Sequence, residues 1–403
     1  MTATPAPTGP QSRPRGRAHA AWVALVVAAL IAGACADDSG SPEDTASDGT
    51  APVETTAPPT AAPPTTEPVD DRAWPTADWG QVEPEDAGID PVVLDEVVNL
   101  VEASGSDCLV VSRDGQLVGE WFWNETGPDF EREAWSVTKS ITATLVGIAQ
   151  HQGHLDIDQP ASDFIHEWEG TDSEDVTIRN LLSNDSGRFH TFEVDYLDMA
   201  RDADDKTTFA IELDQEHEIG THWVYNNAAI QVLEAVLERA TGTDVGTFAR
   251  EHLFEPLGMS TTIATDPAGN TLTFMGAQMS CRDMARFGLL NLRAGEWDGE
   301  EIVPADFVAE ATRPSTELNP GYGLLWWLFG TDTDELVETA PGQDAIPGGE
   351  PRAYAALGLG GQIVVVIPEH DLVVTRLVGS QTRGSEANLG DLLPKLFDEL
   401  VVD

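Results

Sequence analysis

Hydrophobic positions at both ends of the main body of the chain predict helices and strands that combine into one sheet. Apolar residues at helical spacing predict a helix over 91–104, and two strands are expected within 107–123 around an Asp-Gly turn at 114–115. Near the other end, residues 352–378 are typical of two or three strands, and a helix over 388–401 follows them. Strands and a covering helix from each end favour a single antiparallel sheet built from the two chain termini.

The middle of the chain, roughly 140 to 340, has mostly helical periodicity. Clear examples are residues 227–242 and 281–295, where apolar side chains recur every three or four positions. No internal repeat stands out. The expected fold class is therefore mixed α/β, of the α+β type, with an antiparallel sheet flanked by helices and a mostly helical central region.

The N-terminal segment is typical of an export signal. Three arginines precede an apolar run, residues 20–35, which is too short for a comfortable membrane span and ends in small residues. It resembles a bacterial lipoprotein signal peptide, which implies cleavage before Cys35 and a lipid on its sulfur, although Ala32 stands where such signals usually carry leucine or valine. Ordinary secretion and a retained membrane anchor stay open as alternatives. The expected localisation is outside the cytoplasm, either as a lipoprotein on the outer face of the membrane or secreted.

Composition then divides the rest of the chain. Residues 36–72 are rich in threonine, proline, alanine and acidic side chains with almost nothing to bury, which indicates a disordered tether. The expected organisation is a signal peptide over 1–35, this tether, and a folded domain over 73–403. Two cysteines remain in that domain, Cys108 and Cys281; they can pair in an oxidising compartment or stay as separately buried thiols.

The charge of the chain is strongly negative. Seventy acidic residues against 21 basic ones give a formal net charge of -49 and a pI near 4.1. Such a surface argues against nucleic acid as a partner and favours solubility. A hydrophobic content of 41% is ample for a core.

One of only three lysines, Lys139, lies three residues after Ser136. The apolar pattern places both residues in the first turn of a helix, where side chains three apart share a face. A neutral lysine can act as a base, and the free backbone N–H groups at a helix start can stabilise an oxyanion. The simpler interpretation is a surface helix with a chance lysine, because Ser-x-x-Lys alone is weak evidence.

Two further stretches strengthen the catalytic interpretation. Tyr225 and Asn227 come immediately before an amphipathic helix, where site residues often lie, although a core tyrosine and an N-cap asparagine are the simpler interpretations. Later, Gly358 and Gly360 interrupt a strand and allow close backbone approach to a ligand; a glycine-rich hairpin turn is the alternative.

The order and spacing of these three stretches resemble the serine β-lactamase and penicillin-binding protein superfamily. The likeness is closest to the class C-like branch, which includes esterases and 6-aminohexanoate-dimer hydrolases, and it continues through "TIRNLLSNDSGR", "LFEPLGM", "SCRDMARFGLL" and "YGLLWW". It covers roughly residues 75 to 400. The resemblance implies the β-lactamase/DD-peptidase-like fold and an acyl-enzyme mechanism without metal or cofactor.

The resemblance also implies a role for each residue. Ser136 would attack a carbonyl carbon, and Lys139 with Tyr225 would move the hydroxyl proton to the leaving group. Asn227 would hold Lys139 and the substrate amide. The oxyanion would lie between the backbone N–H groups of Ser136 and Leu359, beside Gly358 and Gly360.

One departure bears on the substrate. Where the β-lactamases have Lys-Thr-Gly, this chain has Ala356-Leu357-Gly358, without a cation or hydroxyl for a substrate carboxylate. Arg352, a few residues upstream, restores a cation only if the strand is shifted. The leading hypothesis is an extracytoplasmic serine hydrolase that cleaves a small ester or amide. The alternatives are a β-lactamase or D-Ala-D-Ala carboxypeptidase and a non-catalytic, lipid-tethered binding protein.

Further candidates for the wall of the pocket are Gln278, Asp195 and Tyr196.

Overall fold

The computed structural model describes residues 72–76, 78–337, 346–379 and 389–402. The predicted signal peptide, Cys35 and almost all of the predicted tether lie outside the described residues. Within the described part of the chain, no helix is long and apolar enough to cross a membrane.

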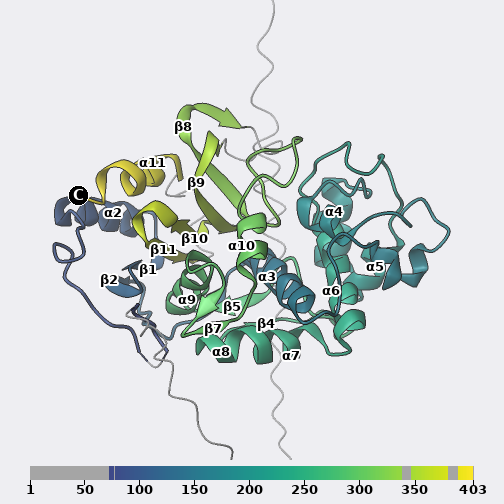
Figure 1. Cartoon of the computed structure of the whole chain (residues 1–403), viewed down its shortest axis with the longest axis horizontal. Helices are drawn as coiled ribbons and strands as arrows, with labels where there is room; N and C mark the ends of the chain where they lie inside the picture. The colour runs from purple at the N-terminus through teal and green to yellow at the C-terminus, as the bar shows by residue number, and fades with distance from the viewer. Residues whose placement is uncertain (1–71, 77, 338–345, 380–388, 403) are drawn as a thin grey trace, which may run out of the picture. The chain divides into compact units, whose positions relative to one another are not determined.

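A six-stranded antiparallel sheet forms the centre of the fold (Figure 1). Its spatial order is β2-β1-β11-β10-β9-β8, so the first two strands of the chain join the last four, as the sequence predicts. The strands are β1 Ser106–Arg113, β2 Gln116–Phe122, β8 Trp327–Val337, β9 Ile346–Gly358, β10 Gln362–Ile367 and β11 Leu372–Val378. The strand β8 was not predicted.

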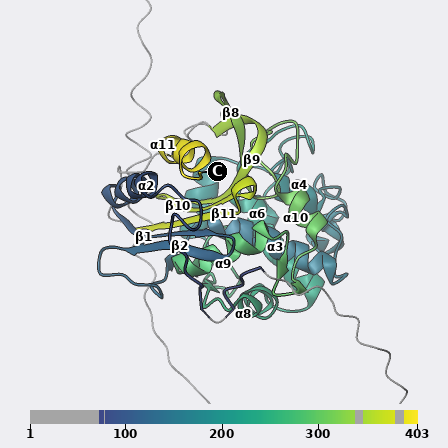
Figure 2. The same ribbon diagram turned by 60° about the vertical axis from the view of Figure 1, so that its left-hand side comes forward.

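Helices cover both faces of this sheet (Figure 2). On one face lie α2, Pro91–Ala103, and α11, Leu389–Pro394, which continues as a π-helix over Lys395–Glu399. On the other face lie α9, Cys281–Leu292, and α3, Val137–His151. Every residue of β10 and β11 is buried, because helices exclude water from both sides.

Local sequence explains the first covering helix. The Asp90 carboxylate accepts the Val92 N–H at 2.8 Å and caps α2, whose first residue is a proline. Leu94, Val97 and Val101 follow at helical spacing and are buried against the sheet.

The helical region lies beside the sheet and includes most of residues 157–260 (Figure 1). In chain order this region contains 3₁₀ turns at Ala161–Asp163 and His166–Trp168, α4 Ile178–Ser183, a π-helix at Glu193–Asp202, α5 Lys206–Glu212, α6 Asn227–Thr241, α7 Val245–Ala249, a π-helix at Arg250–Phe254 and α8 Glu255–Leu257. Short strands β3 Arg132–Glu133, β4 Thr262–Ile263 and β5 Ala277–Met279 form a second sheet, and β6 Glu296–Trp297 pairs with β7 Glu300–Glu301. The last helical elements are α10 Ala305–Ala311 and a 3₁₀ turn at Pro368–His370.

A disulfide bond joins Cys108 on β1 to Cys281 at the start of α9. Both residues are 1% exposed. Of the two alternatives left by the sequence, the structure therefore has the paired cysteines. The start of α9 is also bound to β11, where the Thr375 hydroxyl donates to the Cys281 carbonyl at 2.9 Å.

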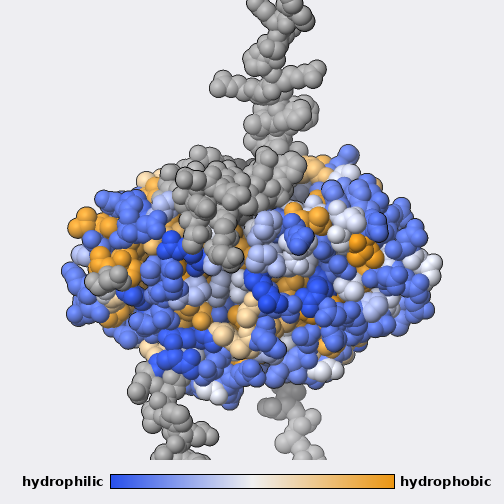
Figure 3. All heavy atoms as spheres, turned by 45° about the horizontal axis from the view of Figure 1, so that its top comes forward, coloured by the Kyte–Doolittle hydropathy of each residue, from blue (hydrophilic) through white to orange (hydrophobic). Residues whose placement is uncertain are grey.

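The surface agrees with the composition. In the view of Figure 3, hydrophilic residues cover most of the described surface and hydrophobic ones form small, separate groups. Such a distribution suits a strongly acidic, water-soluble folded body.

Candidate active site

Ser136 and Lys139 meet at the start of α3. The Lys139 amine lies 2.9 Å from the Ser136 hydroxyl and also donates to the Phe274 carbonyl at 2.8 Å. Ser136 occupies the N-cap position but its side chain makes no capping bond. The hydroxyl is therefore placed toward the lysine instead of stabilising the helix end.

The backbone before Ser136 is strained. Trp135 has a φ of 51°, a conformation that bulky residues rarely adopt. Two hydrogen bonds hold the turn: the Thr138 hydroxyl donates to the Trp135 carbonyl at 2.6 Å, and the Ala134 N–H donates to the Ala277 carbonyl at 2.8 Å. This turn brings the serine to the helix start, a feature that the sequence pattern does not reveal.

Burial changes the chemistry of Lys139. The side chain is 1% exposed, and desolvation lowers the pKa of its amine to about 7, although the negative charge of Asp195 opposes that shift. Near neutral pH a large fraction of the amine is therefore uncharged. A neutral amine at hydrogen-bond distance from a hydroxyl has the geometry and the protonation state of a general base.

Tyr225 packs directly against this pair. The Lys139 amine lies 4.7 Å from the centre of its ring, and the Ser136 side chain acts to lower the pKa of its phenol. Burial raises the pKa of the phenol well above its usual value, so the hydroxyl stays protonated at neutral pH. The ring also stacks on Trp327 with centroids 5.6 Å apart, so Tyr225 is both a core residue and a neighbour of the serine.

Asn227 is close to the site but not in the expected contact. Within the described residues, the Lys139 amine donates to Ser136 and Phe274 and forms no hydrogen bond with Asn227, so the expectation that Asn227 holds the lysine is wrong. Its amide instead donates to Asp195 at 2.7 Å. The N-cap of α6 is the preceding residue, Asn226, whose side chain accepts the Ala229 N–H.

The glycine-bearing end of β9 lies against the chain just before Ser136. A Cβ atom on Gly358 would come within 2.2 Å of the Ala134 carbonyl oxygen, so only glycine fits this approach. Leu359, 46% exposed, begins the turn to β10, and Gly360 follows with a φ of 84°. The predicted partner of Ser136 in an oxyanion site therefore lies in a turn adjacent to the helix start.

Arg352 does not face this site. Its guanidinium pairs with Glu369 and, at 3.3 Å, with Asp398, and it lies over the Phe397 ring. These partners belong to the 3₁₀ turn before β11 and to the helical end of the chain, on the side of the sheet covered by α2 and α11. The hypothesis that Arg352 restores a carboxylate anchor is therefore wrong.

Three other pocket candidates have definite positions. Burial raises the pKa of the Tyr196 phenol to about 12, although the Asn227 side chain opposes that rise. Asp195 is buried beside the same amide, and Gln278 lies on β5, paired with Glu133 of β3. The contact of the Phe274 carbonyl with Lys139 was not predicted.

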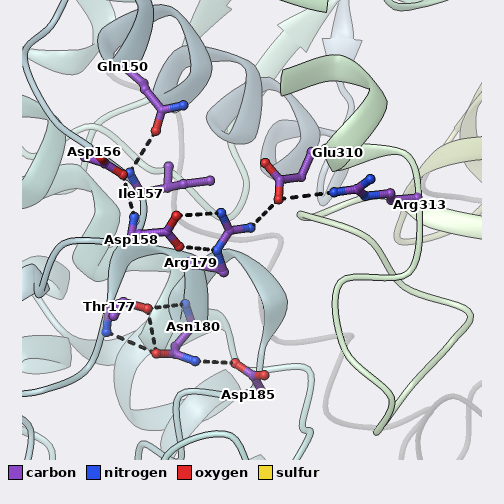
Figure 4. A network of polar contacts seen from close by, with 10 residues as sticks. All are labelled: Gln150, Asp156, Ile157, Asp158, Thr177, Arg179, Asn180, Asp185, Glu310 and Arg313. Atoms are coloured by element: carbon purple, nitrogen blue, oxygen red, sulfur yellow. Dashed lines mark hydrogen bonds and ion pairs between the residues drawn. The ribbon is translucent and has the colours of Figure 1, made fainter. Parts of the chain in front are cut away.

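A network of polar contacts surrounds Arg179 and Asn180 at the start of α4 (Figure 4). Arg179 on α4 pairs with Asp158 and with Glu310, which ties three separate segments together. The neighbouring Asn180 donates to Asp185 at 2.9 Å and so fixes the loop after α4.

That loop then binds the chain on both sides of Tyr225. The Asn184 carbonyl accepts the Val224 N–H at 3.0 Å, and its side chain accepts the Asn226 N–H at 3.2 Å. The position of the tyrosine hydroxyl thus depends on contacts that reach back to α4.

Comparisons with known proteins show the family of the chain. A model of the beta-lactamase family matches residues 97–395. The 6-aminohexanoate-dimer hydrolase of Paenarthrobacter ureafaciens is 24% identical over 314 residues, which cover 70% of this chain and 75% of that protein.

Two solved structures share the fold. The penicillin binding protein from Bacillus halodurans superposes with a TM-score of 0.56 at 17% identity, over 70% of this chain and 94% of that one. The octameric penicillin-binding protein homologue from Pyrococcus abyssi does so with a TM-score of 0.57 at 18% identity, over 76% of each chain. With the family match spanning both the serine-lysine helix and the strands of the sheet, the predicted resemblance is confirmed, and the chain belongs to the beta-lactamase family, in the superfamily of serine β-lactamases and penicillin-binding proteins.

Proposed function

We propose that this protein is a serine hydrolase that cleaves small, uncharged or amine-bearing esters or amides through an acyl-enzyme on Ser136. The observation that carries the proposal is the 2.9 Å contact between the Ser136 hydroxyl and an amine whose pKa is about 7. Membership of a hydrolase family supports the same reaction class.

The protonation states divide the work between Lys139 and Tyr225. The neutral amine of Lys139 takes the hydroxyl proton as Ser136 attacks the substrate carbonyl carbon. The Tyr225 phenol stays protonated, so it relays a proton to the leaving group and does not act as a phenolate base. The leaving group departs with the Tyr225 proton, and the proton held by Lys139 replaces it on the phenol. Water then attacks the acyl-enzyme, gives a proton to the neutral Lys139 amine, and that proton passes to the Ser136 oxygen as the acid is released.

The substrate class follows from the charges near the site. Ala356 provides no cation, and Arg352 is already paired with two carboxylates. A substrate carboxylate beside Ser136 would thus find a charge-assisted partner in neither Ala356 nor Arg352, and a carboxylate left unpaired costs about 1 to 3 kcal/mol. Neutral and amine-bearing acyl donors avoid that cost.

We also propose that the protein acts outside the cytoplasm, tethered to the membrane by a lipid on Cys35. The support is the signal-like sequence over 1–35 and the buried disulfide, because such bonds persist mainly in oxidising compartments.

A fluorophosphonate probe tests the assignment of the nucleophile. We expect a single covalent adduct that peptide mapping places on Ser136 and that Ser136→Ala abolishes. Ser140 is the matched control, because it lies on the same helix but donates to the Leu325 carbonyl, and Ser140→Ala should still be labelled. A folded wild-type protein that takes up no probe would instead support the non-catalytic binding protein.

Substrate preference is tested by comparing kcat/KM values. We expect the kcat/KM of short-chain p-nitrophenyl esters to exceed that of nitrocefin by about 5- to 150-fold, the factor that corresponds to one unpaired carboxylate. Because the family also contains β-lactamases, the opposite result has a clear meaning: nitrocefin turnover equal to or faster than that of the esters would favour the β-lactamase alternative.

A further inference from the structure

Asp195 is a buried carboxylate next to the proposed reacting groups. It lies in the π-helix Glu193–Asp202 and is 1% exposed. One of its oxygens accepts the Ala228 N–H at 2.8 Å, and the other accepts the Asn227 side chain at 2.7 Å and the Asn227 N–H at 3.3 Å.

All three contacts favour the ionised form of this side chain. Each partner is a donor, and an ionised carboxylate only accepts. The two N–H groups also belong to the first turn of α6, a 15-residue helix, whose positive end stabilises an anion. Burial raises the pKa of Asp195, and these donors oppose that rise without cancelling it.

Four titratable groups face Asp195 from the surrounding elements. Lys139 on α3 is attracted to it, and His190 lies with its Nε2 3.8 Å from the carboxylate. Tyr196 and Tyr225 also sense its charge, which contributes to the raised pKa of each phenol. Among these groups Lys139 is the one whose protonation state decides whether Ser136 can be activated.

We propose that Asp195 is a positioning residue of this site: it fixes the Asn227 amide and holds a negative charge that favours the protonated form of Lys139. This inference rests on the proposed function. Fixing the amide nitrogen also fixes the amide oxygen of the same planar group, so the face that Asn227 presents is set. A role as the helix cap does not account for the arrangement, because Asn226 already caps α6.

The effect of the Asp195 charge on the pKa of Lys139 can be measured. Asp195 raises the pKa of Lys139 against the effect of burial, so removing the charge lets the amine lose its proton at lower pH. In Asp195→Asn, the acid limb of the rate of fluorophosphonate labelling at Ser136 should therefore move to lower pH, by about half a unit or more. The plateau above that limb should fall about 10- to 100-fold, because an amide cannot accept all three hydrogen bonds.

Asp195→Glu separates the effect of the charge from the effect of the hydrogen bonds. It also provides a second test if Asp195→Asn does not fold. It keeps the charge but displaces the carboxylate, so the acid limb should stay at the wild-type pH while the plateau falls. A wild-type plateau in this variant would overturn the positioning role. An acid limb that moves to lower pH would overturn the role of the charge.

Asp283→Asn is the matched control. Asp283 is also buried, with a pKa raised by burial, and accepts a backbone N–H from Ser260, but it pairs with Arg286 on α9. Its variant should lose stability without moving the acid limb. Labelling of the wild-type protein tests the proposed function independently of Asp195. If the wild type is labelled with an acid limb and Asp195→Asn keeps that limb unchanged, only the inference about Asp195 fails.

Discussion

Lys139→Arg should reduce the rate of Ser136 acylation by about 10² or more, the scale of a lost general base. Arginine preserves the positive charge but cannot lose its proton in a protein, so it cannot accept the serine proton. The wild-type rate should rise with pH through about 7, where the lysine amine becomes neutral, and the residual rate of the variant should lack this rise. Fluorophosphonate labelling and ester hydrolysis, each followed across pH, measure both effects.

Lys206→Arg is the control for this experiment. Lys206 is 6% exposed and its pKa is also lowered by burial, but its amine donates to the Ala203 carbonyl at 2.6 Å. The same substitution there should leave acylation at its wild-type rate. Acylation by Lys139→Arg at the wild-type rate would show that another group removes the serine proton.

The central sheet could be predicted because its strands carry local signals. The Asp-Gly pair at 114–115 has the positive φ values of a tight hairpin turn, as its residue types indicate. The strands β10 and β11 are short, mostly apolar segments between turn residues. The helix predicted over 388–401 lies at the right place, although its described part changes to a π-helix after Pro394. Proline lacks a backbone N–H, which explains why regular α-helical bonding does not continue there.

The candidate site was predictable only where residue type and spacing carry the chemistry. Ser136 and Lys139 are three residues apart on one helix, so their contact follows from helical geometry. The Phe274 carbonyl carries no such signal, because every residue has a carbonyl. Asp195 was one of 70 acidic residues in the sequence, and only the fold shows that it is buried beside Asn227. The φ of Trp135 is likewise set by tertiary contacts rather than by its residue type.

Loss of the Cys108–Cys281 bond should lower the free energy of unfolding by about 3 to 5 kcal/mol. The bond closes a loop of 173 residues that contains Ser136, Lys139, Tyr225 and Asn227, and a cross-link over so long a loop strongly restricts the unfolded chain. It joins β1 to α9 and touches none of those four residues, so the protein that remains folded should keep its rate of Ser136 labelling.

Denaturant unfolding of the wild type with and without reductant measures this loss without changing any side-chain packing. Cys108→Ala/Cys281→Ala is the control: it should be insensitive to reductant, and it should be less stable than the reduced wild type because it also loses two buried sulfur atoms. Peptide mapping should show the two cysteines in one joined peptide before reduction and in two separate peptides after it. An unfolding midpoint of the wild type that reductant does not change, although mapping shows the bond broken, would mean that the contacts between β1 and α9 suffice to hold the sheet and the helical region together.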